Sequence, residues 1–387
     1  MSETTLPKVE VPNNGTQAIT KDEAFYRASQ WQLVWWKFRR HKLAQLAMVV
    51  LAIFYIIAIF AEVIAPWDPL HRMKEYAAMP PMNVYFFDYN GKFRGPFVYN
   101  MVFGRDPVTL RPVYKTDFET ILPIKFFAKG DPYKLWGLIS WDRHLIGIDQ
   151  PDLTKPYPFF LLGTDSLGRD LLSRIFFGGR ISLTVGLIGV ALSFIFGLLL
   201  GGVAGFFGGV VDEVIMRIID VLISLPQIPL WMSLAAALPQ DWPQLRTYFF
   251  VTIILSIFGW TSLARTVRGK MLSMREEDFV MAARLDGESE WSIITRYMLP
   301  GFASYIIVSL TISIPGMILG ETSLSFLGIG LRAPTISWGV MLQDAQTIQT
   351  VSQLPWLLWP TVFVVTAVLM FNFLGDGLRD AADPYVT

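Results

Sequence analysis

Apolar residues occur along this sequence in six long runs, each close to the ~20 residues that a helix needs to cross a bilayer. The second run contains no charged residue, and prolines interrupt the third at Pro226 and Pro229. The fifth run contains Pro315 and Glu321. The pattern predicts six transmembrane helices, at residues 43–64, 181–211, 218–238, 248–264, 306–327 and 356–374.

The chain between the first two predicted spans is long and has a different pattern. Residues 84–88 and 93–99 read as strands on either side of Asn90-Gly91, a sequence that favours a hairpin turn. We therefore divide the chain into residues 1–42, a span at 43–64, a partly β insertion at 65–158 and a five-span core at 159–387. The insertion is either a loop packed on the membrane face, a docking surface for an external partner, or a cap over a transport path.

Composition agrees with a polytopic membrane protein. Hydrophobic residues make up 53% of the 387 residues and the mean hydropathy is +0.43. Charged residues make up 17%, against about 25% in soluble domains. These values exclude a disordered chain, a coiled coil, a secreted disulfide scaffold and a nucleic-acid binder. The chain has no cysteine and three scattered histidines, so we predict no catalytic thiol, no disulfide and no metal site.

Basic residues predict the orientation in the membrane. Residues 1–42 contain seven Lys and Arg, and residues 265–296 contain six. The short segments 239–247 and 328–355 contain one each, Arg246 and Arg332. Because short cytoplasmic segments are enriched in Lys and Arg, we expect both termini and the 265–300 loop in the cytoplasm. The 65–180 segment then lies outside.

The predicted cytoplasmic loop is amphipathic. Ser273 and Glu276 have the spacing of a capping box, and Gly287 is suited to end the following helix in the left-handed conformation. A second amphipathic run places Trp291, Ile294 and Met298 on one face. Two short helices around a glycine suit a groove on a soluble partner. The alternative is an interfacial helix that lies on lipid.

Two further sets of residues are candidates for function. Gly197, Gly201, Gly205 and Gly209 recur every four residues, which predicts close helix packing in the second span. Glu321 and Asp220 are acids at membrane depth, so we consider both as candidates for the substrate path. For Asp220 the alternative is a structural pair with Arg217.

Several motifs resemble a known family. Ala282-Ala283, Gly287 and Leu299-Pro300 have the spacing of the EAA loop of ABC importer permeases, although Met281 and Tyr297 depart from its consensus. The branch that carries dipeptides, oligopeptides or nickel is similar in five further segments, and the order of these segments matches its C-type permease. They are residues 161–183 (LLGTDSLGRDLLSRIFFGGRISL), 264–284 (ARTVRGKMLSMREEDFVMAAR), 320–331 (GETSLSFLGIGL), 337–339 (SWG) and 371–384 (FNFLGDGLRDAADP).

The resemblance implies an all-α polytopic membrane protein with the six-helix fold of type I ABC importers. In that family the EAA loop couples the permease to an ATPase subunit. The implied partners are a second permease in a heterodimer, two ATPases that bind ATP and Mg²⁺, an extracytoplasmic solute-binding protein and membrane lipid, in the bacterial inner membrane. The solute is a peptide or a similar small molecule. The sequence contains no phosphate-binding loop, so we expect no enzyme activity and no cofactor on this chain.

Two other classes of function are less consistent with the sequence. A self-sufficient secondary transporter or channel is expected to contain inverted repeats, and none is visible. A membrane enzyme needs paired catalytic groups facing one cavity, and the sequence offers none.

Overall fold

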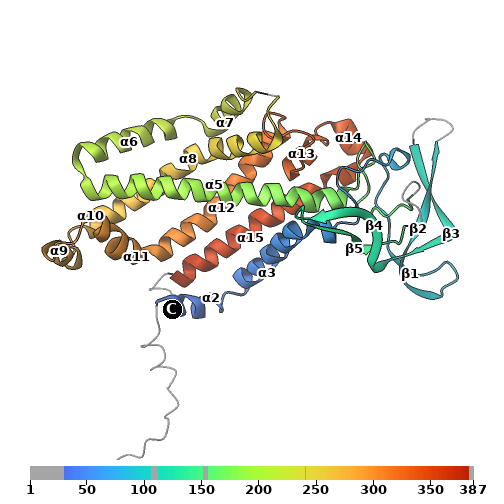
Figure 1. The fold of residues 1–387 in the computed structure, drawn as a ribbon, viewed down its shortest axis with the longest axis horizontal. Coiled ribbons are helices and arrows are strands. Elements are labelled where there is room, and N and C mark those ends of the chain that lie inside the picture. The colour runs from blue at the N-terminus through green and yellow to red at the C-terminus, as the bar shows by residue number, and fades with distance from the viewer. Residues whose placement is uncertain (1–29, 106–111, 151–155, 240, 383–387) are drawn as a thin grey trace, which may run out of the picture.

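The computed structural model describes residues 30–105, 112–150, 156–239 and 241–382. Long helices lie side by side in a bundle, and a β-rich insertion extends from one end (Figure 1). Residues 1–29 of the predicted N-terminal segment and residues 383–384 of the last motif lie outside the described residues.

The helices are α2 Gln30–Phe38, α3 Lys42–Ile59, α4 Ala61–Ile64, α5 Leu171–Phe207, α6 Gly209–Ser224, α7 Gln227–Ala236, α8 Gln244–Met274, α9 Asp278–Leu285, α10 Glu290–Ser292, α11 Leu299–Gly301, α12 Ala303–Phe326, α13 Trp338–Gln343, α14 Ile348–Gln353 and α15 Trp359–Ala382, with short helical segments η1 Lys74–Tyr76, η2 Ile293–Met298 and η3 Pro355–Leu358. The strands are β1 Tyr85–Phe87, β2 Phe93–Arg105, β3 Pro112–Pro123, β4 Lys125–Leu135 and β5 Ile139–Gly147.

Among the described residues, five helical segments are long and apolar enough to cross a membrane: α3, α5, α8, α12 and the segment formed by η3 and α15. The helices α6 and α7 qualify together, but the chain bends by 88° between them. The bend lies at Leu225 and Pro226, where the sequence predicts an interruption. The all-α fold with a β-containing insertion is thus confirmed, with five long apolar helices and a bent helix pair in place of the third predicted span.

The predicted limits of the second and third spans are wrong. Helix α5 begins at Leu171, ten residues earlier than the predicted start at Ile181, because the Asp170 carboxylate caps its first turn. It ends at Phe207, and two successive glycines with φ of +65° and +57° reverse the chain into α6. Gly209 therefore belongs to α6 and is not in the glycine series of α5.

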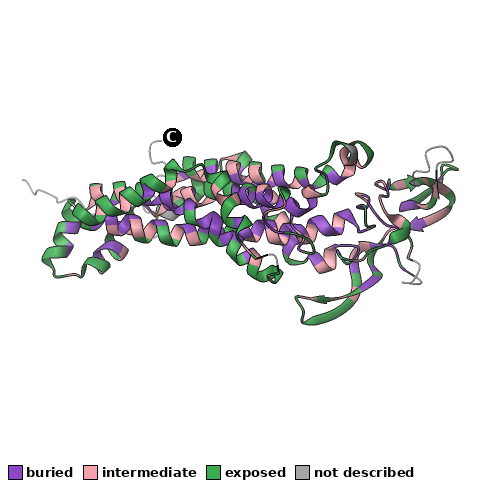
Figure 2. Ribbon diagram, turned by 90° about the horizontal axis from the view of Figure 1, so that it is seen from above, coloured by how far each residue is buried: buried purple, intermediate pink, exposed green. Residues whose placement is uncertain are grey.

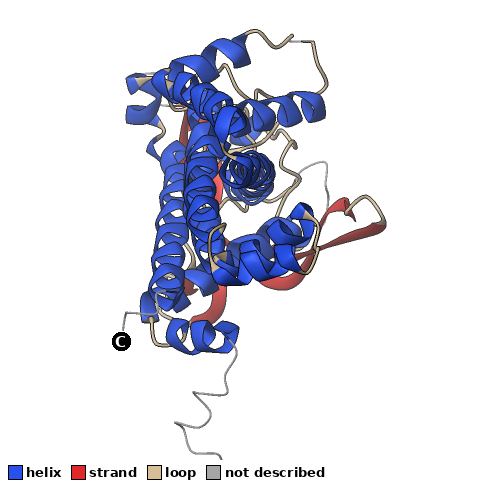
Figure 3. Ribbon diagram, turned by 90° about the vertical axis from the view of Figure 1, so that its left-hand side faces the viewer, coloured by secondary structure: helices blue, strands red, loops and turns tan. Residues whose placement is uncertain are grey.

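The bundle is built around α5. Its glycine face lies against α8, while α12 and α15 pack side by side and α3 covers α15. Figure 3 shows the helices of the bundle from the end opposite the insertion. Buried side chains follow the inner faces of these helices, whereas α6 is largely exposed (Figure 2). A cluster of buried apolar side chains that includes Leu183, Leu255, Ile318 and Trp338 forms the centre. Burial of a large apolar side chain stabilises a fold by about 1.5–3 kcal/mol.

The insertion contains two antiparallel sheets. The predicted hairpin is confirmed, since β1 pairs with β2 through Tyr85↔Phe97 and Phe87↔Phe93. Strand β3 completes the first sheet, and β4 and β5 form a separate hairpin. The insertion has an apolar cluster separate from that of the bundle, in which Trp67 and Met79 are buried together with Phe160.

A buried hydrogen bond joins the insertion to the bundle beside a cluster of buried ion pairs. Arg169 donates to Asp165 at 2.6 Å, and Arg174 of α5 donates to the same carboxylate. The backbone N–H of Trp67 donates to the Ser173 hydroxyl at 3.1 Å. Because a buried charge is costly without a partner, this paired cluster fixes the entry into α5.

Candidate functional site

The segment from α9 to α11 lies at the end of the bundle opposite the insertion (Figure 1). Helix α8 continues to Met274, so the predicted capping box is wrong: Ser273 is inside α8, and Glu277 is the N-cap of α9 without a side-chain hydrogen bond. Tertiary packing of α8 extends the helix past the local capping signal.

Gly287 has the conformation that the sequence predicts. Its φ is +77°, its N–H donates to the Arg284 carbonyl, and the Glu288 N–H donates to the Ala283 carbonyl, both at 3.1 Å. These two bonds form a Schellman motif that ends α9. The second helix then starts at Ser289, whose hydroxyl accepts from the N–H of Ser292.

One face of this segment is packed on the bundle. Val280 and Ala283 of α9 are buried together with Ile293, Ile294 and Met298. They pack against Val267 and Met271 of α8 in one cluster. The base of the segment is therefore packed into the core together with α8.

The other face is exposed and carries apolar side chains beside charged ones such as Arg284 and Asp286. Leu285 is 87% exposed, and Phe279, Met281 and Trp291 are exposed as well. Trp291 does not share the buried face with Ile294 and Met298, which corrects the predicted amphipathic run. Of the residues in the EAA-like spacing, Ala282 and Pro300 are exposed, Ala283 is buried and Leu299 is half-buried. The segment thus combines a packed base with exposed apolar side chains.

The glycine series of α5 lies where α5 crosses α8. A Cβ at Gly201 would lie 2.4 Å from the Ala264 carbonyl oxygen, and one at Gly205 would lie 2.6 Å from that of Arg268. Gly197 faces Leu263 at 3.0 Å. Nothing lies within 4 Å of a Cβ at Gly209, so this glycine does not take part in the contact.

Glu321 is fully buried and held by serine hydroxyls. Ser325 and Ser337 donate to one carboxyl oxygen at 2.8 and 2.7 Å, and Ser182 of α5 donates to the other at 3.2 Å. The Ser182 hydroxyl in turn accepts from the N–H of Trp338. Glu321 therefore joins α5, α12 and the start of α13.

Asp220 is exposed and pairs with α8. Its carboxylate lies 2.5 Å from the Arg265 guanidinium, and Arg265, not Arg217, is its partner. About two helical turns earlier in α6, Asp212 forms a bidentate pair with Arg268. The acids of α6 thus face the basic residues of α8, a partnership that follows from the antiparallel packing of two helices and not from local spacing.

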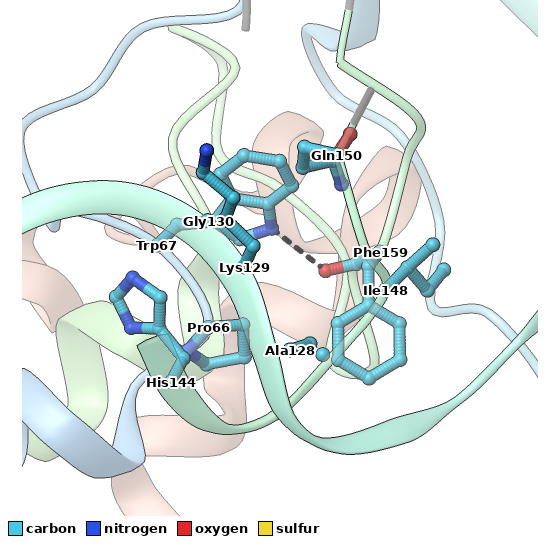
Figure 4. Close-up of a pocket in the computed structure, with 10 residues that line it drawn as sticks. Pro66, Trp67, Ala128, Lys129, Gly130, His144, Ile148, Gln150 and Phe159 are labelled. Atoms are coloured by element: carbon cyan, nitrogen blue, oxygen red, sulfur yellow. Dashed lines mark hydrogen bonds between the residues drawn. The ribbon is translucent and has the colours of Figure 1, made fainter. Parts of the chain in front are cut away.

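Two hollows near the insertion end were not predicted. One of about 160 Å³ lies between the start of α8 and the linker after α12, beside Trp242, Thr247 and Arg332. The other, of about 10 Å³, lies between Trp67, His144 and Gln150, and the Trp67 indole N–H donates to the Phe159 carbonyl beside it (Figure 4). The second has room for about one water molecule and is a packing gap. In the part of the chain described by the structure, no group of three or more acids and histidines is placed to hold a metal ion.

Comparisons with known proteins identify the family. Residues 197–387 match the model of the binding-protein-dependent transport system inner membrane component, and residues 29–81 match the N-terminal transmembrane domain of oligopeptide transport permease C. The dipeptide transport system permease protein DppC of Bacillus subtilis is 40% identical over 57% of this chain and 68% of its own length. The DppC protein of Lactococcus lactis subsp. cremoris is 30% identical over 96% of this chain and 94% of its own length. This chain belongs to that family of ABC importer permeases.

As a family member the chain is a transmembrane permease subunit of an ATP-driven importer and works with ATPase and other permease subunits. It is a non-catalytic membrane component, and ATP hydrolysis belongs to the ATPase partner. The glutathione transport system permease protein GsiD of Pectobacterium atrosepticum is a further relative, 39% identical over 68% of this chain and 83% of its own length. Among solved structures, a chain of the inward-facing methionine transporter MetNI covers 55% of this chain and 97% of its own length at 17% identity and a TM-score of 0.42, which is too low for an argument about this chain.

Proposed function

We propose that this permease forms half of a path for peptides or similar small solutes, in a heterodimer with a second permease. The observation that carries the proposal is the exposed face of α9 and α10, with Phe279, Leu285 and Trp291 on it, on a base that is packed into the bundle. We assign this face to an ATPase subunit, which binds ATP and Mg²⁺ and transmits its motion through α9 to α8. The relatives are named as permeases for dipeptides, oligopeptides or glutathione, and these names support a peptide as the solute.

The arrangement of the two polar ends supports the orientation. The segment of α9 to α11, which follows the basic residues Arg265, Arg268 and Lys270 of α8, lies at the opposite end of the bundle from the β-rich insertion (Figure 1). We place α9, both termini and the ATPases in the cytoplasm of a bacterial cell and the insertion outside the inner membrane. There the insertion is available to a solute-binding protein. Exposed apolar side chains along α6, among them Val214, Ile218 and Val221, support a second permease beside this helix.

Site-specific crosslinking tests the assignment of the ATPase surface. The chain has no cysteine, so Leu285→Cys introduces a single reactive thiol at a side chain that is 87% exposed. In the importer complex in nanodiscs, we expect this thiol to crosslink to the ATPase subunit. Ile348→Cys on α14 is 90% exposed at the insertion end and serves as the control. Equal crosslinking of both positions, or none at 285, would contradict the assignment.

Substitution of Gly287 tests whether the geometry of this loop transmits the ATPase cycle. A β-branched residue in the left-handed region costs about 1–2 kcal/mol, which is about tenfold in a docking equilibrium. We expect Gly287→Val to reduce uptake of a labelled dipeptide about tenfold in proteoliposomes, with the subunits still co-purifying. Gly287→Asn tolerates the same backbone conformation and is expected to keep most of the activity. Uptake by the valine variant near the wild-type rate would refute the coupling role.

A further inference from the structure

The turn of the β4–β5 hairpin exposes several large apolar side chains. We call residues 133–141 the hairpin tip. Leu138 is 81% exposed there, and Trp136, Ile139 and Trp141 are exposed as well. A soluble domain does not normally expose such a patch at the end of a hairpin unless it binds something.

The tip lies at the end of the first transmembrane helix. The Trp136 indole N–H donates to the carbonyl of Ile59, the last residue of α3, at 2.9 Å. The same ring packs on Phe60 with a centroid distance of 5.5 Å. The hairpin leaves the bundle sideways, and its turn lies at the level of the helix ends rather than beyond them (Figure 2). The tip is thus at the depth where the apolar span ends.

The backbone of the tip is fixed in this position. Leu135 pairs with Ile139, and Trp136 and Gly137 between them have φ of +50° and +74°. A bulky residue with positive φ is uncommon and unfavourable. Here the hydrogen bond to Ile59 and the contact with Phe60 hold Trp136, so the turn presents Leu138 outward.

The surroundings of the tip match a lipid interface. The exposed apolar face of α3, which includes Ile53 and Ile56, leads along the helix towards the tip. Residues 133–141 contain two tryptophans and one lysine and no acid. Tryptophan is enriched at the headgroup level of membranes, and lysine extends its amine to the headgroups. Within the described residues, Lys134 forms no ion pair, and it lines an open hollow of about 440 Å³ with Tyr133, Trp141 and Asp142, whose carboxylate lies 3.9 Å from the Lys129 amine.

We propose that the β4–β5 hairpin is an interfacial membrane anchor. Its tip inserts Trp136, Leu138 and Ile139 at the boundary between lipid headgroups and acyl chains beside α3, and Lys134 contacts the lipid phosphates. The anchor fixes the insertion relative to the membrane. This inference depends on α3 spanning the bilayer and does not depend on the transported solute or on the ATPase surface.

A depth measurement in the assembled importer tests the anchor. A nitroxide on Leu138→Cys is compared with one on Tyr89→Cys, which is 84% exposed near the β1–β2 turn. The complex is reconstituted in phospholipid nanodiscs with partner subunits that lack cysteine. Collision rates with oxygen, which concentrates in lipid, and with a water-soluble nickel chelate are measured by electron paramagnetic resonance. We expect a higher ratio of oxygen to nickel collisions at position 138 than at position 89.

Three outcomes decide the proposal. An equal ratio at the two positions would overturn it. An immobilised label at 138 that is protected from both reagents would place the tip against the partner permease and would also overturn it. In a Trp136→Ala background we expect the ratio of oxygen to nickel collisions at position 138 to fall. An unchanged ratio would refute the positioning role of Trp136. None of these readouts uses transport, so failure of the proposed function would leave the test intact.

Discussion

At the residue scale, three buried acids near the insertion end have different kinds of partner. Asp165 lies between two arginines, whereas Asp170 accepts hydrogen bonds from the N–H and hydroxyl of Ser173, at 2.7 and 2.6 Å. Glu321 is held by serine hydroxyls and forms no ion pair among the described residues. A hydroxyl donates to an ionised or a protonated carboxyl group, so the last two acids need no basic partner.

Asp170 makes the stability of the fold depend on pH. Burial raises its pKa from 3.8 to about 7, although its hydrogen bonds to Ser173 lower it. The folded state therefore holds a proton that the unfolded chain releases above its own, lower pKa. The stabilisation is complete below the unfolded pKa near 3.8 and is lost as the pH rises through about 7.

Asp170→Asn tests this dependence. The amide cannot ionise, while its oxygen still accepts from the N–H of Ser173. We expect the melting temperature of the wild type to fall between pH 5 and pH 8 by more than that of the variant, as measured in detergent. Identical slopes would show that Asp170 does not titrate in this interval.

Glu321→Gln separates a structural role from a role in the substrate path. The glutamine amide nitrogen is a donor, so it faces hydroxyl donors, and loss of a buried hydrogen bond costs about 1–3 kcal/mol. We expect a lower melting temperature and an unchanged KM for dipeptide uptake by the folded fraction. Ser313→Ala, an exposed position on the same helix, is the control. An unchanged melting temperature with a raised KM would instead place Glu321 on the path.

At the scale of elements, helix packing depends on individual glycines. Gly201 and Gly202 are adjacent in α5, yet only Gly201 faces the backbone of α8. The four-residue period of the sequence identifies the correct face of the helix. The end of the helix decides how far that face extends, since the turn at Gly208 removes Gly209 from it.

Alanine substitutions at these two glycines give opposite expectations. Gly201→Ala places a methyl group 2.4 Å from the Ala264 carbonyl oxygen, and overpacking of this kind costs about 1–3 kcal/mol. Gly202→Ala meets no atom within 4 Å and gains up to about 1 kcal/mol of helix propensity. Thermal unfolding of both variants in detergent measures the difference. Equal melting temperatures would mean that α5 and α8 do not approach as closely as described.

At the scale of the whole molecule, the insertion is held against the bundle by the segment before α5. A Cβ at Gly168 would lie 2.0 Å from the Met73 carbonyl oxygen, and the Met73 N–H donates to the Gly168 carbonyl. The motif at residues 161–183 thus carries a contact between two parts of the chain that are about a hundred residues apart in sequence. Its resemblance to the family motif does not reveal this contact.

Gly168→Ala is expected to loosen this contact. The control is Gly95→Ala, because Gly95 has a similar φ of +77° but no atom within 4 Å of a Cβ. Both alanine variants therefore carry the same cost of a positive φ. A difference in hydrogen exchange between them reports the clash with Met73. We expect faster hydrogen exchange at residues 66–82 in the Gly168 variant alone. Equal exchange in the two variants would show that the close approach is not needed for docking.

The sequence by itself determined the membrane class, the six apolar runs, the β hairpin of the insertion, the left-handed Gly287 and the family. Insertion into a bilayer depends on the summed hydropathy of about 20 residues, and a left-handed turn depends on one glycine, so both are local properties. The motifs gave the family because they carry many specific residues in a fixed order.

Tertiary structure decided the rest. The ends of α5 and α8, the 88° break between α6 and α7 and the pairing of Asp220 with Arg265 depend on which elements meet. The same is true of the position of the hairpin tip beside Ile59. A charge or a helix end takes the nearest partner in space, and that partner is often distant in sequence. Local patterns such as the Ser273 capping box therefore fail where packing extends a helix.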